Sequence, residues 1–222
     1  MPDAVIFGAG GLGRDVVDIC DAAESSGDTD LNLIGFIDED ASLHGQTMMD
    51  RPILGGLDWL RERGGTDLRV LLAIGSPATR RKLKLLIDDI GVEFGSINHP
   101  TVTTTPYVAI GRGVIVAPGA TLMSGANLGD FSYVNVHAIV GHDVVLENFS
   151  NIGPGVTLSG GIRIREGADI GAGASIIQYL DIGEWSVVAA GAAVVNNVPA
   201  NTLVAGVPAV VKRENSAGWH EA

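Results

Sequence analysis

The chain has 222 residues, of which 46% are hydrophobic and 18% are charged, so it can bury one large core or two small ones. Its formal net charge of −12 argues against nucleic acid and anionic membrane as main partners, because such binding depends on basic patches. No apolar run reaches the ~20 residues of a membrane span, and Met1-Pro2-Asp3 lacks the basic start of a secretory signal. The single cysteine, Cys20, cannot form an internal disulfide. We therefore expect a cytoplasmic protein without a membrane partner.

Residues 1–100 alternate between expected strands and helices. Apolar runs at 4–7, 33–37, 69–74 and 92–97 predict strands, whereas residues 13–24 and a basic segment after Gly75-Ser76-Pro77 predict helices. This alternation is typical of a small parallel α/β sheet. We therefore expect a Rossmann-like half domain of the α/β class over 1–100, with its boundary at Asn98-His99-Pro100.

A glycine-rich motif follows the first expected strand. Gly8-Ala9-Gly10-Gly11-Leu12-Gly13 has the spacing G-x-G-x-x-G, and Asp38 ends the second strand, where an acid would meet a ribose or a base. In this context the amides of Gly8, Gly10, Gly11 and Gly13 and the helix N-terminus can hold phosphate oxygens. About 100 residues form only half of a dinucleotide-binding fold, and no domain for hydride transfer follows. We expect the loop to hold the diphosphate of a nucleotide-linked substrate; the alternative is that its glycines serve only close helix–strand packing.

From Ile110 to Val194 every sixth residue is aliphatic, over fifteen successive positions. The residues two places earlier are all small or aliphatic, and glycine often follows the aliphatic residue. Neither a 3.6-residue helix nor a two-residue strand period produces this pattern, whereas a six-residue period predicts an all-β, parallel β-helix of triangular cross-section. Three hexads close one coil, so we expect five coils, all fifteen aliphatic side chains pointing inward, and residues 18 apart stacked on each other. Because one prism buries only a narrow core, we expect three prisms to pack side by side.

A histidine in the repeat is a candidate catalytic residue. His142 lies two places after an inward aliphatic, near a corner or on an outer face, and Gly160 lies one coil further on. A neutral histidine beside exposed backbone amides suits acetyl transfer from a thioester: the imidazole takes a proton from the attacking amine or hydroxyl, and an amide stabilises the oxyanion. Asp143 can orient the imidazole only if a corner intervenes, because neighbouring side chains on a strand point to opposite faces. The alternative is a solvated His-Asp pair on the prism surface.

Several motifs together carry a resemblance to a known family. They are G-A-G-G-x-G-R in the first loop, Phe36-Ile37-Asp38, Pro52-Ile53-Leu54-Gly55, Ala73-Ile74-Gly75, His99-Pro100, the hexapeptide prism, and the closing Val204-Ala205-Gly206-Val207-Pro208-Ala209. With these motifs the chain resembles the NeuD/PglD family of bacterial sialic-acid O-acetyltransferases and UDP-4-amino-sugar N-acetyltransferases. The resemblance covers nearly the whole chain, up to Arg213. The resemblance implies a left-handed β-helix of the hexapeptide-repeat acyltransferase type over 101–213, a tail over 214–222, and a homotrimer with acyl-CoA bound between neighbouring prisms.

The resemblance also implies roles for single residues. His142 matches the general base, Asp143 the acid that orients or polarises it, and Asn135 an asparagine near the reacting group. Acetyl-CoA, the cosubstrate, would meet the backbone at Gly160, Ala172 and Ala190. The nucleotide sugar would meet the glycine loop, Asp38, Gly75 and Ser76. Lys212 and Arg213 lie where the superfamily often has a basic residue near the 3′-phosphate of CoA, and a solvated tail is the alternative.

Two departures from the family pattern leave the acceptor open. UDP-amino-sugar members carry a histidine where this chain has Leu12, and a second histidine where it has Asn151. We expect an acetyl-CoA-dependent N-acetyltransferase that acts on a nucleotide-linked amino sugar, with no metal. The alternative within the family is O-acetylation of sialic acid or of another sugar hydroxyl.

Two alternatives lie outside the family. The spacing His137-x4-His142 is similar to the zinc-binding pair of γ-type carbonic anhydrases, but the position two coils earlier, where those enzymes have a third histidine, is Thr101, and zinc catalysis needs three protein ligands. The other alternative is a prism without enzymatic activity, such as a scaffold or a nucleotide-sugar sensor.

Overall fold

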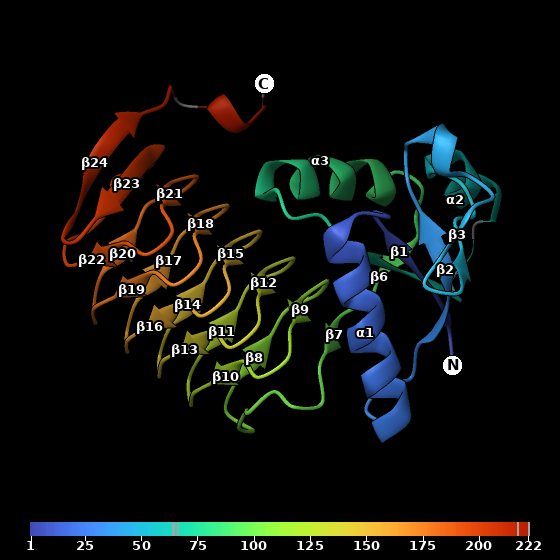
Figure 1. The fold of residues 1–222 in the computed structure, drawn as a ribbon, viewed down its shortest axis with the longest axis horizontal. Helices are drawn as coiled ribbons and strands as arrows, with labels where there is room; N and C mark the ends of the chain where they lie inside the picture. Colours follow the sequence, from blue (N-terminus) through green and yellow to red (C-terminus); the bar gives the residue numbers. More distant parts are fainter. Residues whose placement is uncertain (64, 66, 217, 222) are drawn as a thin grey trace. The chain divides into compact units, whose positions relative to one another are not determined.

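The computed structural model describes residues 1–63, 65, 67–216 and 218–221. The chain divides into two compact units, Met1–Pro100 and Thr101–Ala222. Figure 1 shows the elements of each unit, which we describe separately.

The first unit contains a four-stranded parallel sheet with the strand order β2-β1-β5-β6. Its elements are β1 (Asp3–Phe7), α1 (Gly11–Ser26), β2 (Asn32–Ile37), the 3-10 helix η1 (Ala41–Leu43), β3 (Thr47–Met48), β4 (Arg51–Pro52), α2 (Leu57–Arg63), β5 (Leu68–Leu72), α3 (Pro77–Asp88), β6 (Glu93–Phe94) and β7 (Ile97–Asn98). The central strands β1 and β5 are almost entirely buried, which explains their continuous apolar runs. Since β2 and β5 flank β1, the strand order reverses at the carboxyl ends of β1 and β5, where open α/β sheets bind ligands. The expected Rossmann-like α/β class is confirmed.

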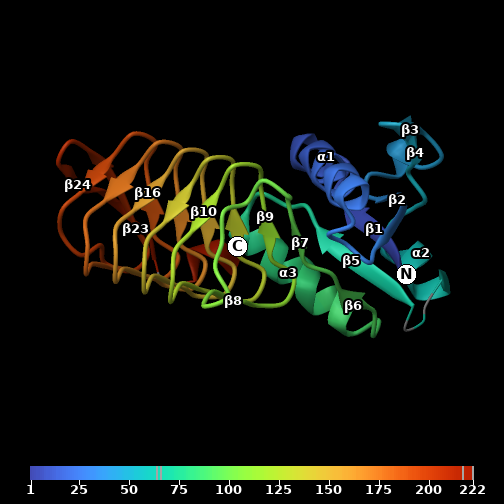
Figure 2. The same cartoon turned by 90° about the horizontal axis from the view of Figure 1, so that it is seen from below.

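The second unit is a left-handed parallel β-helix, as the six-residue period predicts. Its fifteen coil strands are β8 (Ala109–Ile110), β9 (Ile115–Val116), β10 (Thr121–Leu122), β11 (Asn127–Leu128), β12 (Tyr133–Val134), β13 (Ile139–Val140), β14 (Val145–Leu146), β15 (Asn151–Ile152), β16 (Thr157–Leu158), β17 (Arg163–Ile164), β18 (Asp169–Ile170), β19 (Ser175–Ile176), β20 (Asp181–Ile182), β21 (Val187–Val188) and β22 (Ala193–Val194). Each pairing joins residues 18 apart, as in Thr121 with Ile139 and Ile139 with Thr157. Figure 2 shows the coils following one another along the prism.

The coil strands form the three faces of the prism. The first face has the order β10-β13-β16-β19-β22, the second β20-β17-β14-β11-β8, and the third contains β21-β18-β15-β12-β9. The chain runs from the first face to the second and then to the third. We call the turns that follow these faces the first, second and third corners.

The prism core consists of the aliphatic residue of each hexad and the small residue two places before it. The aliphatic side chains from Val116 to Val194 are buried, as expected. Ile110 is the exception, because its side chain is 37% exposed. Its strand β8 is the edge strand of the second face, so no earlier coil of that face covers it.

The prism ends in a shortened coil and a hairpin. Val187 pairs with Leu203, 16 residues on instead of 18, and β23 (Thr202–Gly206) then pairs antiparallel with β24 (Ala209–Glu214). A cis peptide bond joins Val207 and Pro208 in the hairpin turn. The segment expected as a tail, 214–222, begins in β24 and includes the 3-10 helix η2 (Trp219–Glu221), whose His220 ring stacks on Trp185 at a centroid distance of 3.7 Å.

Adjacent residues of one coil strand should differ sharply in their effect on stability. Ile164 is fully buried in the core, whereas the side chain of Arg163 is about half exposed on the second face. We expect Ile164→Ala to lower the free energy of unfolding by about 2–5 kcal/mol, because it leaves a cavity. Arg163→Ala should cost less than about 1 kcal/mol. Urea denaturation of both variants measures the difference, and equal losses would contradict the inward register.

Candidate active site

A histidine–aspartate pair lies at the first corner of the prism. His142 follows β13, and its Nδ1 lies 2.9 Å from Oδ2 of Asp143. Asp143 has a φ of +57°, so the chain turns sharply between the two residues and both side chains reach the same side. The corner that an orienting role for Asp143 requires is therefore present.

The imidazole of His142 lies against the backbone of Gly160, one coil further on. A Cβ atom at Gly160 would lie 2.3 Å from Nε2 of His142, so a larger residue there would displace the ring. The amide of the next residue, Gly161, donates to the carbonyl of His142 at 2.8 Å and fixes the two coils to each other. Within the described part of the chain, the amide of Gly160 itself has no hydrogen-bond partner. This corner thus brings an imidazole and an available N–H together.

The Asp143 contact fixes the tautomer of the neutral imidazole. A carboxylate only accepts hydrogen bonds, so Nδ1 of His142 carries the hydrogen and Nε2 keeps its lone pair. Nε2 is the nitrogen that faces Gly160. The side chains of His142 and Asp143 are 60% and 73% exposed, so a reactant can approach them. The arrangement can accept a proton at Nε2 and stabilise negative charge beside it.

The other predicted prism residues lie at a different corner. Asn135, Ala172 and Ala190 follow β12, β18 and β21 of the third face, and so belong to the third corner. Ala172 and Ala190 stack one coil apart, where the amide of Gly191 donates to the carbonyl of Ala172 at 2.8 Å. The Asn135 side chain accepts a hydrogen bond from the Val136 amide at 2.7 Å. Within one chain, these residues and His142 therefore lie at opposite ends of a first-face strand.

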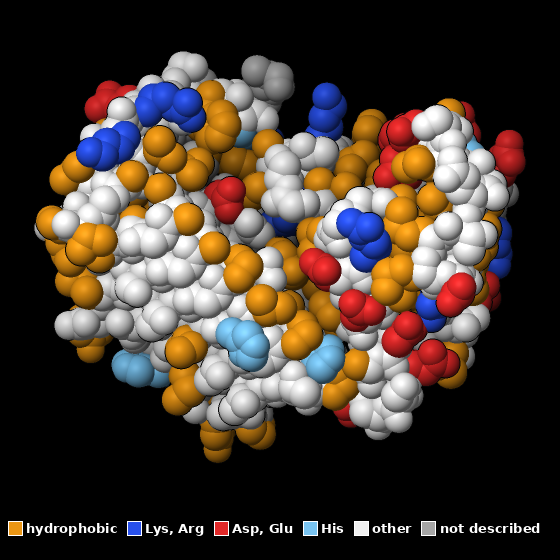
Figure 3. All heavy atoms as spheres, in the orientation of Figure 1, with side chains coloured by type: hydrophobic (Ala, Val, Ile, Leu, Met, Phe, Trp, Pro, Cys, Tyr) orange, Lys and Arg blue, Asp and Glu red, His pale blue; other side chains and the backbone are white. Residues whose placement is uncertain are grey.

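The basic pair Lys212 and Arg213 lies on β24, the outer strand of the terminal hairpin, and both residues are exposed. Figure 3 shows Lys and Arg side chains gathered at the β23–β24 end of the prism. The register of the hairpin shifts between Leu203, which pairs with Arg213, and Val204, which pairs with Val211, so Lys212 is the unpaired extra residue of a bulge.

The two departures from the family pattern have defined surroundings. Asn151 lies on β15 of the third face, and its Nδ2 donates to Oδ1 of Asp169, one coil away, at 2.7 Å. Leu12 is half-buried in the first turn of α1. The Asn151 side chain thus makes a hydrogen bond at a position where relatives carry a histidine, whereas the Leu12 side chain has no polar atom.

The glycine motif divides into two structural and two open positions. Gly8 has a φ of +110°, and a Cβ atom there would lie 2.8 Å from the carbonyl oxygen of Ala73. At Gly13 a Cβ atom would lie 2.0 Å from the carbonyl oxygen of Gly8, so this glycine permits the close approach of α1 to the end of β1. At Gly10 a Cβ atom would meet nothing within 4 Å, and at Gly11 only the Arg14 guanidinium at 4.0 Å. The middle glycines therefore face open space beside the N-terminus of α1.

Asp38 has a role that the sequence did not indicate. Its Oδ2 accepts a hydrogen bond from the Ala9 amide at 2.8 Å, and its Oδ1 accepts one from the Asp40 amide at 2.9 Å. The carboxylate thus links the glycine loop to the segment that follows β2. Any ribose contact of Asp38 would share oxygens that are already engaged.

The turn after β5 is also held from within the unit. Ser76 is the N-cap of α3 and accepts a hydrogen bond from the Thr79 amide at 3.3 Å. Arg80 is 2% exposed, and its Nη1 donates to the carbonyl of Ile74 at 2.6 Å, directly before Gly75. The basic segment after Ser76 therefore supplies a buried positioning residue for the Gly75–Ser76 turn, which its charge alone did not reveal.

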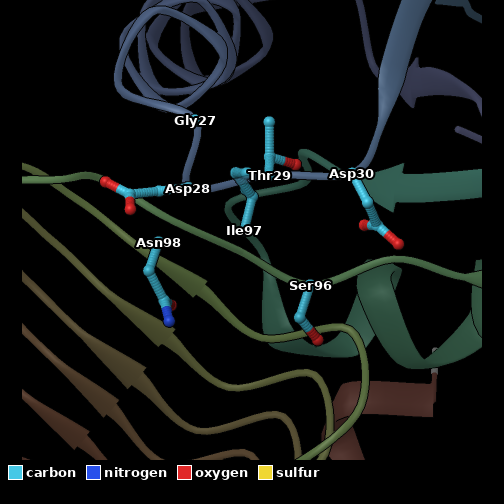
Figure 4. Close-up of a pocket in the computed structure, with 7 residues that line it drawn as sticks. All are labelled: Gly27, Asp28, Thr29, Asp30, Ser96, Ile97 and Asn98. Atoms are coloured by element: carbon cyan, nitrogen blue, oxygen red, sulfur yellow. The ribbon is translucent and has the colours of Figure 1, made fainter.

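A separate cavity of about 480 Å³ lies in the first unit at the carboxyl end of α1. It is lined by Gly27, Asp28, Thr29, Asp30, Ser96, Ile97 and Asn98. In Figure 4 the side chains of Asp28 and Asp30 point in different directions, so they do not converge on one ligand. None of the predicted site residues lines this cavity.

The described residues contain no group of three His, Cys, Asp or Glu side chains that could hold a metal ion. His137 and His142 lie at the third and first corners, so the sequence spacing does not bring them together. Among the helices that the structure describes, none is both long and apolar enough to cross a membrane.

Comparison with known proteins gives consistent similarities. Residues 3–84 match the family model of the PglD N-terminal domain. The structure of PerB from Caulobacter crescentus in complex with CoA and GDP-perosamine is 32% identical, with a TM-score of 0.84 and coverage of 96% of this chain and 98% of PerB. The acetyltransferase domain of PglB from Neisseria gonorrhoeae, in complex with acetyl coenzyme A, is 30% identical, with a TM-score of 0.85 and coverage of 95% and 98%. The GDP-perosamine N-acetyltransferase of Escherichia coli O157:H7 is 28% identical over 90% of this chain and 81% of the relative.

The two kinds of glycine in the first loop should respond differently to substitution. Gly13→Ala forces a methyl group onto the Gly8 carbonyl, and we expect it to lower the free energy of unfolding by about 1–3 kcal/mol. Gly10→Ala meets no atom and should stay within about 0.5 kcal/mol of the wild type. Urea denaturation compares them; equal destabilisation would contradict the division of the motif.

The lone thiol should be inert in the folded protein. Burial, reinforced by the Asp21 carboxylate, raises the pKa of Cys20 to about 12. Since thiol reagents attack the thiolate, Cys20 should not react with Ellman's reagent at mildly alkaline pH until guanidinium chloride unfolds the chain, when one thiol per chain should appear. Rapid labelling of the native protein would contradict the buried position.

Proposed function

Because the chain belongs to the NeuD/PglD-like family of sugar acetyltransferases, we propose that it transfers the acetyl group of acetyl-CoA to the amine of a nucleotide-linked amino sugar. The observation that carries the proposal is the His142–Asp143 pair against the backbone of Gly160. One relative is a GDP-perosamine N-acetyltransferase and the structure of another contains GDP-perosamine, which is therefore the first acceptor to test.

The proposed reaction is a direct attack on the thioester. The amine nitrogen of the sugar bonds to the acetyl carbonyl carbon, and the carbon–sulfur bond breaks with its electron pair remaining on sulfur. Nε2 of His142 takes the proton from the attacking nitrogen and delivers it to the departing thiolate of CoA. Asp143 holds the imidazole through Nδ1 and stabilises its protonated form. The Gly160 amide donates to the carbonyl oxygen as negative charge develops there.

The first unit would hold the nucleotide end of the substrate. Gly10 and Gly11, where a Cβ atom would meet open space, lie beside the N-terminus of α1 at the reversal of strand order, a suitable place for a diphosphate. The Gly75–Ser76 turn lies at the same edge of the sheet, after β5. This loop then acts as a substrate handle and does no redox chemistry.

The positions of the prism residues favour active sites shared between subunits. His142 and Gly160 lie at the first corner, whereas Asn135, Ala172 and Ala190 lie at the third. One acetyl-CoA molecule can contact both sets if the first corner of one prism lies beside the third corner of another. A homotrimer with cyclic symmetry forms three such sites.

The chemistry of the faces supports contact between prisms on the first face. The outward residues of its strands, Thr121, Ile139, Thr157, Ser175 and Ala193, carry no charge, and Figure 3 shows few charged side chains on the visible side of the prism away from the β23–β24 end. The second face instead carries an ion network, in which Arg165 contacts Glu147 at 3.2 Å and Asp181 at 2.6 Å. The hydrogen bond from Arg165 holds the pKa of Asp181 below its usual range, so Asp181 keeps its charge at neutral pH.

Thiol release from acetyl-CoA tests the proposal with GDP-, UDP- and dTDP-linked amino sugars, free sialic acid and CMP-sialic acid as acceptors. We expect turnover with a nucleotide amino sugar and a loss of about 10²–10⁴-fold in His142→Gln, because the proton acceptor is removed. Asp143→Asn should retain more activity, because Nε2 is kept. Unchanged CoA affinity and melting temperature of His142→Gln provide the control.

The other outcomes separate the alternatives. Turnover with sialic acid alone would replace the proposal by O-acetylation. Full activity of His142→Gln would assign the base to another residue. The absence of turnover across the acceptor panel, together with the absence of CoA binding, would favour the non-enzymatic prism.

Shared sites predict complementation between two inactive variants. His142→Gln disables the first corner, and Ala172→Trp should block the third corner, where Ala172 is exposed. In randomly mixed trimers, about a quarter of the sites combine an intact first corner with an intact third corner. We expect co-expression to restore about a quarter of wild-type activity, whereas sites within one chain would restore none.

A further inference from the structure

A tyrosine lies one coil beyond the glycine that follows Gly160. Residues Tyr107, Gly125, Asp143, Gly161 and Tyr179 form one column at the first corner, each 18 residues from the next. A Cβ atom at Gly161 would lie 2.6 Å from Cδ1 of Tyr179, so the phenol ring covers the Gly161 backbone. The amide of Tyr179 also donates to the carbonyl of Gly160 at 3.1 Å. Tyr179 therefore contacts the residue whose amide we assign to the oxyanion, through its carbonyl, and the residue that follows it.

The left-handed backbone of Tyr179 is not offset by burial of its ring. Its φ is +61°, a left-handed conformation that bulky residues rarely adopt. Phe131, Phe149 and Trp185 of the prism share this conformation, and each is buried at the second corner. Their rings gain packing: Phe131 stacks on Phe149 at a centroid distance of 5.2 Å, and Trp185 on His220. Tyr179 is instead 76% exposed, so burial of its ring does not offset the strained conformation.

The direction of the bound cosubstrate indicates what the ring contacts. This inference rests on the proposed function, in which the thioester lies at Gly160 and CoA extends past Ala172 and Ala190 toward the C-terminal coils. Tyr179 lies on that same side of Gly160, whereas the acceptor amine has to reach Nε2 of His142. We propose that the ring of Tyr179 is the surface on which the pantetheine arm of acetyl-CoA lies next to the thioester.

The chemistry of both partners fits this contact. The pantetheine arm alternates methylene and amide groups, and a planar ring covers such a chain with little loss of conformational entropy. Ile177, 42% exposed on the first face two residues earlier, extends the apolar surface beside the ring. Tyr179 is thus a binding and positioning residue for the donor, and it takes no part in proton transfer.

Calorimetric titration with CoA tests the role directly, without an acceptor. Tyr179→Gly removes the ring and also relieves the left-handed backbone, so we expect a CoA dissociation constant raised about 5- to 20-fold together with an unchanged or higher urea midpoint. Tyr179→Phe should bind CoA within about twofold of the wild type, because the ring face remains. In steady-state assays of Tyr179→Gly, KM for acetyl-CoA should rise while KM for the nucleotide sugar stays unchanged.

Tyr107→Gly is the matched control, because Tyr107 is also 76% exposed and belongs to the same column on the other side of Asp143. It should bind CoA like the wild type. The assignment of Tyr179 would be overturned if Tyr179→Gly bound CoA as tightly as the wild type, or if Tyr107→Gly lost as much CoA affinity as Tyr179→Gly. It would also be overturned if Tyr179→Gly formed a smaller assembly than the wild type. If the wild type itself failed to bind CoA, the proposed function would fall and this inference with it.

Discussion

The second unit depends on one constraint: from β8 to β22, backbone hydrogen bonds pair the strands of successive coils at an offset of 18 residues. This register converts distance along the chain into contact between side chains. It sets His142 against Gly160, places Gly161 beside Tyr179, and stacks Ala172 under Ala190. Positions in a column therefore depend on one another: the His142 and Tyr179 rings each lie where the neighbouring coil has a glycine, Gly160 and Gly161.

The regular coils require strained backbone conformations at the corners. Most corner turns need a left-handed residue, and glycine supplies it where nothing else is required. Aspartate at 143 uses the same conformation to bring its carboxylate onto the histidine of the preceding position. The aromatic residues of the second corner offset the cost by burial, and Tyr179 does not. Strain that packing does not offset thus occurs beside the proposed reaction centre.

Periodicity predicted the features that repeat, because core burial imposes them on every hexad. The inward columns and the stacking of position 142 on position 160 follow from it, as does the α/β class of the first unit from its buried strands, whereas the solenoid has about six turns and not the five that fifteen hexads predict. Features fixed by single contacts could not be predicted in this way. Asp38 braces the Ala9 amide, and Arg80 is buried under the Gly75 turn, although both looked like ordinary charged residues. Short elements such as α2 and the β3–β4 hairpin lack the length for a period, and the exposure of Ile110 reflects the end of a ladder.

The fixed register also limits how the length of this protein can change. Adding or removing one residue within a strand would shift every later side chain by one position and turn core residues outward. A complete coil of 18 residues, in contrast, preserves every column and lengthens the prism by about 4.8 Å, the spacing of neighbouring strands. An extra loop at a corner leaves the columns aligned as well. The span between the His142 corner and the terminal hairpin can therefore change only in whole-coil steps, so homologues that differ in length should differ by complete coils or by corner loops.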